Sequence, residues 1–243
     1  SGVSCKLIDG DRGMFMAEQL KEVINYPNQY YLPLSSLVVF ENTTNKGGGA
    51  CWDFNELEKI QKVCAAQGLS YHLDGARLFN ALVAKKETPE QYGKLFDSIS
   101  ICLSKGLGAP IGSLLLSSEK NIHQAIRIRK LFGGGMRQVG YLAAAGIYAL
   151  DHHIERLAED HQRANLLGRA LADCDWVEKV EQIETNIIIF NLHKHTDEAL
   201  FLTAMEKERI KLISMGEGKL RIVTHLEFTD EMLSKVIKVL ERI

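Results

Sequence analysis

The amino-acid sequence predicts an α/β fold, and three observations support this. Short apolar runs rich in Val, Ile and Leu alternate with longer segments in which apolar residues recur at helical spacing. The length of 243 residues fits one large domain with a smaller one attached. Hydrophobic residues make up 46% and charged residues 25%, which are the proportions of an ordinary globular protein rather than a disordered or fibrous chain.

Four strands and one helix are expected in the first half of the chain. The strands are the short apolar runs at residues 36–41, 70–74, 98–103 and 112–116. Asp53, with Glu56 three residues on, is placed to cap a helix, and Gly68 is placed to end it. The last two strands are too close for a crossover helix, so they are antiparallel or not adjacent.

The second half is expected to be mostly helical. Helices are predicted at residues 118–131, 138–150, 152–171, 197–208 and 230–242, and strands at 186–190 and 220–223. The helix at 138–150 is apolar on several sides, which predicts that it is buried. The β-α-β-α order of the last part predicts a compact small domain that begins near residue 150.

Charge, hydropathy and side-chain chemistry exclude several classes of function. The chain has 29 Lys and Arg against 31 Asp and Glu, so no basic excess is available to neutralise a nucleic-acid backbone. No apolar run approaches the ~20 residues that a membrane span needs. Five widely spaced cysteines favour reduced thiols in a cytoplasmic protein over a disulfide framework. No metal site is expected, because His193 and His195 have no carboxylate or cysteine nearby to complete a ligand set.

A carboxylate and an arginine follow one predicted strand. Asp74 ends the strand at residues 70–74, and Arg77 comes three residues later. Ligands of open α/β sheets bind outside the carboxyl ends of the strands, so both side chains are candidates for a binding site. An alternative of about equal weight is that Asp74 caps the following helix and Arg77 is its solvated partner.

A lysine follows a second strand. Lys105 lies between Ser104 and Gly106, and glycines let a ligand approach the backbone closely, so this lysine is a candidate nucleophile that forms a Schiff base. The alternative is an ordinary solvated lysine in a turn. The glycines at 106, 108 and 112 read G-x-G-x-x-x-G and lead into a strand, which excludes a dinucleotide-binding fingerprint.

Three glycines at residues 133–135 precede Arg137 and the helix at 138–150. Free N–H groups and the helix dipole favour an anion at such a place, and Arg137 would strengthen the site. The alternative is a flexible hinge between two helices. Taken together, the three motifs supply an amine, a carboxylate and an anion-binding arginine, which is the set that pyridoxal 5′-phosphate needs for its aldehyde, pyridine nitrogen and phosphate.

The amino-acid sequences of the motifs indicate a protein family. The chain reads HLDGARLFNA at residues 72–81, SICLSKGLGAPIGSLL at 100–115 and RKLFGGGMRQVGYLAAAGIYAL at 129–150. These runs closely resemble the low-specificity L-threonine aldolases, and the similarity continues to RIVTHLEFT at 221–229. The resemblance implies the fold type I of pyridoxal-phosphate enzymes, as in aspartate aminotransferase. Residues 1–150 would be the C-terminal part of the large domain, with its mostly parallel sheet, and residues 151–243 a small α+β domain.

The resemblance also implies roles for residues around the cofactor. Lys105 would hold pyridoxal phosphate as a Schiff base, and Asp74 would pair with the pyridine nitrogen. Ser104 flanks the lysine and would help to shape the pocket. Arg137 would reach the cofactor phosphate, that of a neighbouring subunit.

For the substrate, a small amino acid, the resemblance implies two arginines. Arg77 would contact the phenolic-oxygen side of the cofactor and the substrate carboxylate, and Arg221 would help to clamp that carboxylate. The implied reaction cleaves L-threonine or L-allo-threonine to glycine and acetaldehyde through the Lys105 Schiff base and a glycine quinonoid. The implied enzyme is a cytoplasmic homotetramer, a dimer of dimers with shared active sites. The alternatives are another pyridoxal-phosphate β-eliminating lyase, or an inactive fragment that serves only in subunit association.

Two features depart from the family pattern. The chain reads ENTTN at residues 41–45, where Thr44 replaces a histidine that is thought to handle the substrate hydroxyl. Thr44 cannot act as a base near neutral pH, so another group or water would be needed. Members of the family also carry an N-terminal portion, with a phosphate loop and a stacking histidine, that is not matched here. We therefore expect these residues alone to bind pyridoxal phosphate poorly and to have little aldolase activity.

Overall fold

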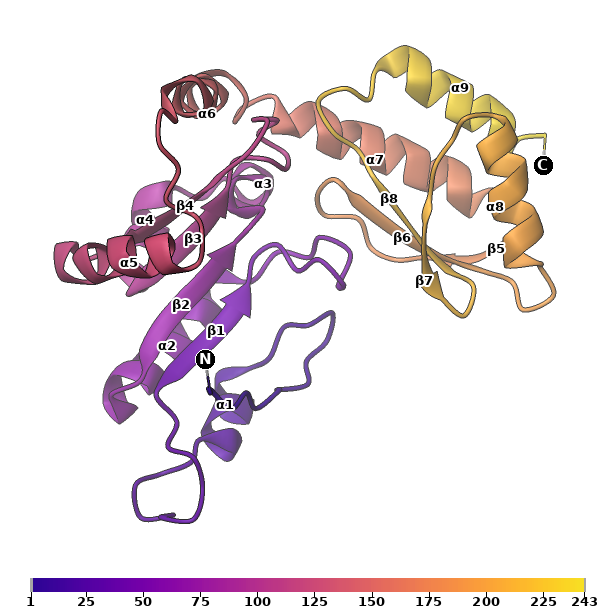
Figure 1. The fold of residues 1–243 in the computed structure, drawn as a ribbon. Helices are drawn as coiled ribbons and strands as arrows, with labels where there is room; N and C mark the ends of the chain where they lie inside the picture. The colour runs from indigo at the N-terminus through magenta and orange to yellow at the C-terminus, as the bar shows by residue number, and fades with distance from the viewer. Residues whose placement is uncertain (1, 243) are drawn as a thin grey trace.

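The computed structural model describes residues 2–242 and contains two four-stranded β-sheets. Figure 1 shows the N-terminal sheet with its helices on one side of the molecule and the C-terminal sheet with its helices on the other. A long helix, α7 (Leu157–Ala172), leads from the first part to the second. Within residues 2–242, no helix has both the length and the apolar character that crossing a bilayer requires.

The first sheet has the strand order β1-β2-β3-β4. Its strands are β1 (Leu37–Glu41), β2 (Ser70–Gly75), β3 (Ser98–Cys102) and β4 (Ser113–Ser117). The first three strands are parallel, so their carboxyl ends meet at one edge of the sheet. The short connection before β4 makes it an antiparallel neighbour of β3, which is one of the two arrangements that the sequence predicts.

The helix predicted after Asp53 is α2 (Phe54–Gln67), and both of its caps are confirmed. The Asp53 carboxylate accepts a hydrogen bond from the N–H of Asn55, and Gly68 ends the helix with a φ of +65°. Three helices of seven or eight residues were not predicted, because so few turns give no clear periodicity. They are α1 (Ala17–Val23), α3 (Leu78–Lys85) and α4 (Pro89–Leu95).

An aromatic core holds this sheet against its helices. Trp52, Tyr71 and Tyr92 are almost fully buried, and the ring of Phe40 lies 4.9 Å from that of Tyr71. Aromatic packing of this kind fixes the strands beyond the stabilisation that burial alone gives. Because β1 and β2 are held in register, Glu41 lies directly beside Asp74 at the carboxyl edge.

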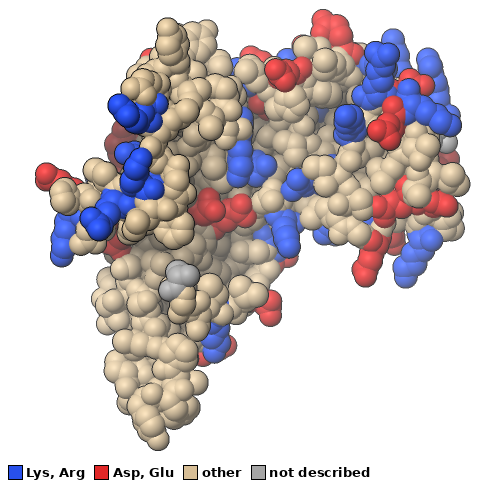
Figure 2. All heavy atoms as spheres, in the orientation of Figure 1, with Lys and Arg blue, Asp and Glu red and all other residues tan. Residues whose placement is uncertain are grey.

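The helices that follow β4 lie on the surface. α5 (Glu119–Leu131) buries no residue, and α6 (Gly140–His152) buries only Gly146 and Ala149. The prediction that residues 138–150 are buried is therefore wrong in the described chain, because Tyr141, 94% exposed, and its apolar neighbours find no covering element among residues 2–242. Figure 2 shows Lys and Arg side chains gathered over the region of α5.

The helix predicted at 152–171 begins later than expected. His152 is the last residue of α6, and α7 begins only at Leu157. Between them His153 Nδ1 lies 2.6 Å from the carbonyl oxygen of Leu107. This contact turns the chain toward the loop after β3, so the helical pattern is interrupted.

The second sheet has the order β5-β6-β8-β7 and is antiparallel throughout. Its strands are β5 (Val177–Val180), β6 (Ile187–Leu192), β7 (Ile213–Gly216) and β8 (Lys219–Val223). One apolar core joins it to α7, α8 (Glu198–Lys207) and α9 (Asp230–Leu240). The four-residue strands β5 and β7 were missed by the β-α-β-α prediction.

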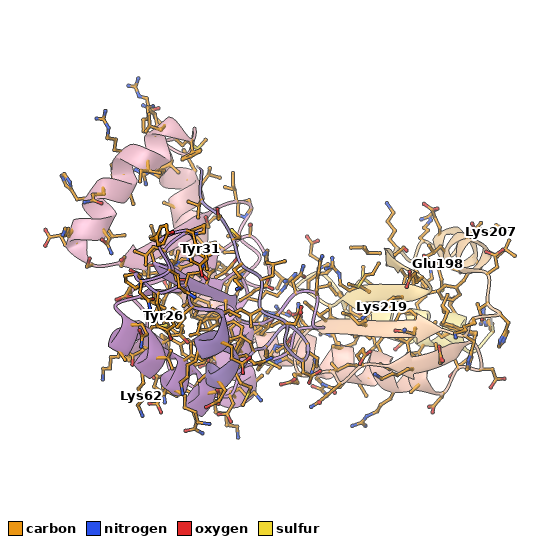
Figure 3. The ribbon with its side chains drawn as sticks, turned by 90° about the horizontal axis from the view of Figure 1, so that it is seen from below. Tyr26, Tyr31, Lys62, Glu198, Lys207 and Lys219 are labelled. Atoms are coloured by element: carbon orange, nitrogen blue, oxygen red, sulfur yellow. The ribbon has the colours of Figure 1, made fainter. Side chains whose placement is uncertain are left out.

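The small α+β unit thus contains the predicted strands and helices together with two further edge strands. Figure 3 shows Glu198 and Lys207 toward the end of this unit that is remote from the first sheet. The domain boundary predicted at residue 150 falls in the last turn of α6 and stays a prediction.

Candidate active site

A cavity of about 370 Å³ opens between the two parts of the molecule, at the carboxyl edge of the first sheet. Both parts contribute to its wall, so its shape depends on how they are held together. The lining residues from the first part are Arg77, Ser104, Lys105, Gly106, Gly108 and Ala109. The second part adds Asn186, Val223, His225, Leu226 and Glu227.

A larger cavity of about 540 Å³ lies elsewhere, between α3, α4 and β4. Its wall is mainly apolar, with Leu78, Phe96 and Leu116 among its members, and its lining contains no lysine, arginine or histidine. The smaller cavity holds Lys105 and Arg77, whereas Asp74 and Arg221 are not among its lining residues.

Lys105 reaches the cavity from a tight turn after β3. The N–H of Gly108 donates to the carbonyl oxygen of Lys105 at 2.9 Å, and Gly108 has a φ of +71°. A Cβ at Gly108 would lie 2.9 Å from Leu226 Cδ2. The backbone conformation favours glycine here, whereas the contact with Leu226 involves the end of a flexible side chain that can shift. Among residues 2–242, Lys105 forms no ion pair.

Asp74 lies at the carboxyl end of β2, beside Glu41 on β1 and Ser100 on β3. Its Oδ1 accepts a hydrogen bond from the N–H of Ala76 at 3.1 Å. The capping alternative is wrong, because the N-cap residue of α3 is Arg77 and no side chain caps that helix. The carboxylate stays at the sheet edge, the position at which α/β sheets bind ligands.

Two guanidinium groups meet on one amide oxygen. Asn45 Oδ1 accepts hydrogen bonds from Arg77 Nη1 at 3.2 Å and from Arg221 Nη1 at 3.0 Å. Burial lowers the pKa of Arg77, the carboxylate of Glu41 opposes this effect, and the charge of Arg221 adds to it. Arginine stays charged at neutral pH in spite of such shifts. The structure therefore brings together Arg77 and Arg221, 144 positions apart by their numbers, as a positive pair.

Arg137 is not brought to this cavity. It is exposed in the loop between α5 and α6, and its proposed contact with a neighbouring subunit stays a prediction. The glycines before it do not open a helix, because α6 begins only at Gly140. Instead the N–H groups of Gly133 and Gly134 donate to the carbonyl groups of Lys130 and Arg129 in α5, and the anion site expected here stays a prediction.

The histidines differ in their positions. His225 lines the cavity, in the segment that follows β8. His72 Nδ1 lies 2.7 Å from Ser98 Oγ, and burial lowers the pKa of His72. The rings of His193 and His195 stack with centroids 5.3 Å apart. In the part of the chain that the structure describes, no three His, Cys, Asp or Glu side chains gather as metal ligands.

Two asparagines were missed as site residues. Asn45 appears in the sequence only as the end of ENTTN, and Asn186 as the start of an apolar strand. Asn186 is almost fully buried and lines the cavity, and its Oδ1 has no hydrogen-bond partner among residues 2–242. Thr44, in contrast, is buried and pairs with Ala50, and it does not line the cavity.

Curated relatives share much of this sequence. Low-specificity L-threonine aldolase 1 of Arabidopsis thaliana is 35% identical over 237 residues, which cover 94% of this chain and 65% of that protein. The low-specificity L-threonine aldolase of Escherichia coli strain K12 is 38% identical over 210 residues, which cover 86% of this chain and 61% of that protein. The chain therefore spans less than two thirds of the length of these two relatives.

Solved structures share the fold. A putative L-allo-threonine aldolase from Listeria monocytogenes aligns with a TM-score of 0.79 and 24% identity, covering 98% of this chain and 67% of that one. A PLP-dependent aminotransferase from Streptococcus suis aligns with a TM-score of 0.68 and 16% identity, covering 95% and 62%. The predicted fold type I is thereby confirmed. The family model of the beta-eliminating lyases matches residues 1–195, and the chain belongs to the beta-eliminating lyase family.

Proposed function

We propose that the chain carries active-site residues of a pyridoxal-phosphate-dependent lyase that cleaves L-threonine or L-allo-threonine to glycine and acetaldehyde. The observation that carries the proposal is the cavity in which Lys105 from the first part faces the second part, with the pair of Arg77 and Arg221 at its edge. Relatives named as threonine aldolases support the choice of substrate.

The residues present fit this cofactor. Lys105 offers an amine without an ion-pair partner among residues 2–242, and Asp74 offers a carboxylate at the sheet edge, with one oxygen on a backbone N–H. The orphaned Oδ1 of Asn186 in the cavity wall leaves an acceptor for a polar ligand. When bound, pyridoxal phosphate supplies an aldehyde for the lysine and a ring that accepts the electron pair of the broken bond.

The chain itself would position the substrate. Arg77 and Arg221 bind its carboxylate, and a clamp at that end orients the Cα–Cβ bond for cleavage. Asp74 would pair with the pyridine nitrogen of the cofactor and so favour its protonated, positively charged form. Ser104 flanks the lysine. Thr44 is buried away from the cavity, so the proton of the substrate hydroxyl is taken up by another group or by water.

The reaction products distinguish this proposal from its rival. The complete natural protein, supplied with pyridoxal phosphate and L-threonine, is expected to release equal amounts of acetaldehyde and glycine. Release of ammonia and 2-oxobutyrate instead would identify another β-eliminating lyase. If neither pair of products forms, the protein is not a lyase of threonine, and a role in subunit association alone becomes the better account.

We also propose that the protein acts in the cytoplasm as a homo-oligomer, a tetramer with shared active sites. The exposed apolar residues of α6, among them Tyr141 and Ile147, support an assembly that covers them. All five cysteines lie in the described part of the chain and are free thiols, which supports a reducing compartment. Size-exclusion chromatography with light scattering tests the assembly.

A further inference from the structure

The amide of Asn45 lies where two like charges meet. Its Oδ1 accepts from Arg77 Nη1 at 3.2 Å and from Arg221 Nη1 at 3.0 Å. Arg77 precedes α3 in the first part, and Arg221 lies on β8 in the second. Two guanidinium groups repel each other, so an acceptor between them is needed to hold both in one place.

The backbone of Asn45 is itself anchored. Its N–H donates to Glu41 Oε2 at 2.8 Å, at the carboxyl end of β1. The preceding residue, Thr44, pairs with Ala50 across the base of the loop. The first sheet therefore sets the position of the Asn45 amide. Because Arg221 donates to this amide, the first sheet also helps to set the position of Arg221.

The neutral amide leaves the arginine pair able to bind an anion. Each guanidinium has five N–H donors, and one nitrogen of each contacts Asn45. The other Nη atoms of the two arginines are left for a ligand, and Arg221 Nε, which is buried from solvent, has no partner among residues 2–242. An aspartate at this place would cancel one of the two positive charges, whereas asparagine aligns the arginines and keeps both charges.

We propose that Asn45 is the positioning residue of the substrate-carboxylate site, holding Arg77 and Arg221 together across the two parts of the molecule. This inference rests on the proposed function only in taking the anion to be an amino-acid carboxylate. Asn45 acts through the two arginines, which set the affinity for the carboxylate and orient the substrate toward Lys105.

The test compares glycine with glycinamide, which has the same amine and no carboxylate. In the complete natural protein loaded with pyridoxal phosphate, calorimetry should show that Asn45→Ala lowers the affinity for glycine by about tenfold. The affinity for glycinamide should stay within about twofold, because only the arginine pair is disturbed. The KM for L-threonine should rise by a similar factor, and kcat should fall by a smaller one, because the same clamp orients the Cα–Cβ bond.

Two further variants separate positioning from folding. Asn45→Asp keeps an acceptor between the arginines and so preserves the fold, but its charge competes with the ligand, and it should weaken glycine binding at least as much as Asn45→Ala does. Asn55→Ala, at an exposed asparagine of α2, should change neither affinity. Circular dichroism checks that each variant is folded.

Three results would overturn the inference: unchanged glycine affinity in Asn45→Ala, an equal loss for glycine and glycinamide, or wild-type affinity in Asn45→Asp. A folded Asn45→Asp keeps the test decisive if Asn45→Ala fails to fold. Failure of the proposed reaction looks different. In that case the wild-type protein releases no acetaldehyde, while its preference for glycine over glycinamide still depends on Asn45.

Discussion

Arg12 Nη1 donates to Glu184 Oε1 at 2.6 Å, in an ion pair that joins two residues 172 positions apart. The other carboxylate oxygen of Glu184 lies 3.3 Å from Lys85 Nζ and accepts from the N–H of Cys51 at 3.3 Å. All three donors belong to the first part of the molecule, and Glu184 lies between β5 and β6 in the second. One carboxylate therefore ties together the two parts that form the active-site cavity.

Replacing Glu184 is expected to loosen this connection. Glu184→Ala removes the carboxylate partner of Arg12, which is mostly buried, and of Lys85, which is more exposed. We therefore expect a loss of about 2 kcal/mol in the free energy of unfolding. Urea unfolding of the complete protein measures it, and KM for the substrate should rise. The matched control is Lys179→Ala, which breaks an exposed pair with Glu181 and should cost less than about 0.5 kcal/mol. Equal effects of the two variants would contradict this account.

Gly75 allows β2 to approach β3 closely. A Cβ there would lie 2.7 Å from the carbonyl oxygen of Ser100 and 3.1 Å from Leu78 Cβ. Gly75→Ala is expected to destabilise the protein by about 2 kcal/mol or more and to displace Asp74 beside it. Gly93→Ala, in α4, meets nothing within 4 Å and should be neutral or slightly stabilising. The midpoint of thermal unfolding and the affinity for pyridoxal phosphate are measured for both variants. A Gly75→Ala variant as stable as the wild-type protein would show that the strands can move apart without cost.

Asp160 is a buried carboxylate that depends on Arg156. Its side chain is fully buried, and Arg156 donates to both oxygens, at 2.7 and 3.2 Å. Arg156→Ala is expected to cost about 3 kcal/mol of unfolding free energy, because it leaves a buried charge poorly paired. Arg169→Ala, at an exposed position of the same helix, should cost little. A loss below about 1 kcal/mol in Arg156→Ala would mean that Arg163 alone holds Asp160.

His161 makes stability depend on pH. Burial lowers the pKa of His161 from 6.5 to about 4, and its Nε2 lies 3.2 Å from Asn80 Oδ1. The unfolded chain therefore binds more protons between these pH values. The contribution of His161, complete above pH 6.5, is lost as the pH falls to 4, by up to about 3 kcal/mol. Urea unfolding at pH 7 and pH 4.5 measures the loss of unfolding free energy on acidification. This loss should be smaller in His161→Gln than in the wild-type protein, and an equal loss in the two proteins would exclude the effect.

Local signals in the sequence predicted most of the regular structure. The strand at Leu37–Glu41 is a β-branched run, and α2 has an aspartate at its start and a glycine at its end, so each could be found from neighbouring residues alone. The exposure of α6 could not be predicted in this way. An apolar sequence indicates only that a helix needs a covering element, not that this element lies in the same chain. The short strand β7, with half of its residues polar or glycine, has no pattern that distinguishes it from a loop.

The residues of the candidate site also fall into those that the sequence could predict and those that it could not. Asp74 and Lys105 could be located because each directly follows a strand, and strand ends are where such folds bind ligands. Arg77 could be located in the same way, although its role was taken from the family resemblance, and Arg221 was assigned through that resemblance alone. Their meeting at Asn45 was not foreseen, because it depends on how two parts of the molecule pack, with Asn45 and Arg221 176 positions apart.

Lys105 is the residue on which the proposed lyase depends. In the complete protein, Lys105→Ala should lower the rate of acetaldehyde release from L-threonine by at least about a thousandfold, while Lys94→Ala, at an exposed position of α4, should be unchanged. Borohydride reduction followed by peptide mass spectrometry should find the cofactor attached to Lys105 in the wild-type protein. Undiminished acetaldehyde release by Lys105→Ala, or a cofactor attached to another lysine, would contradict the assignment.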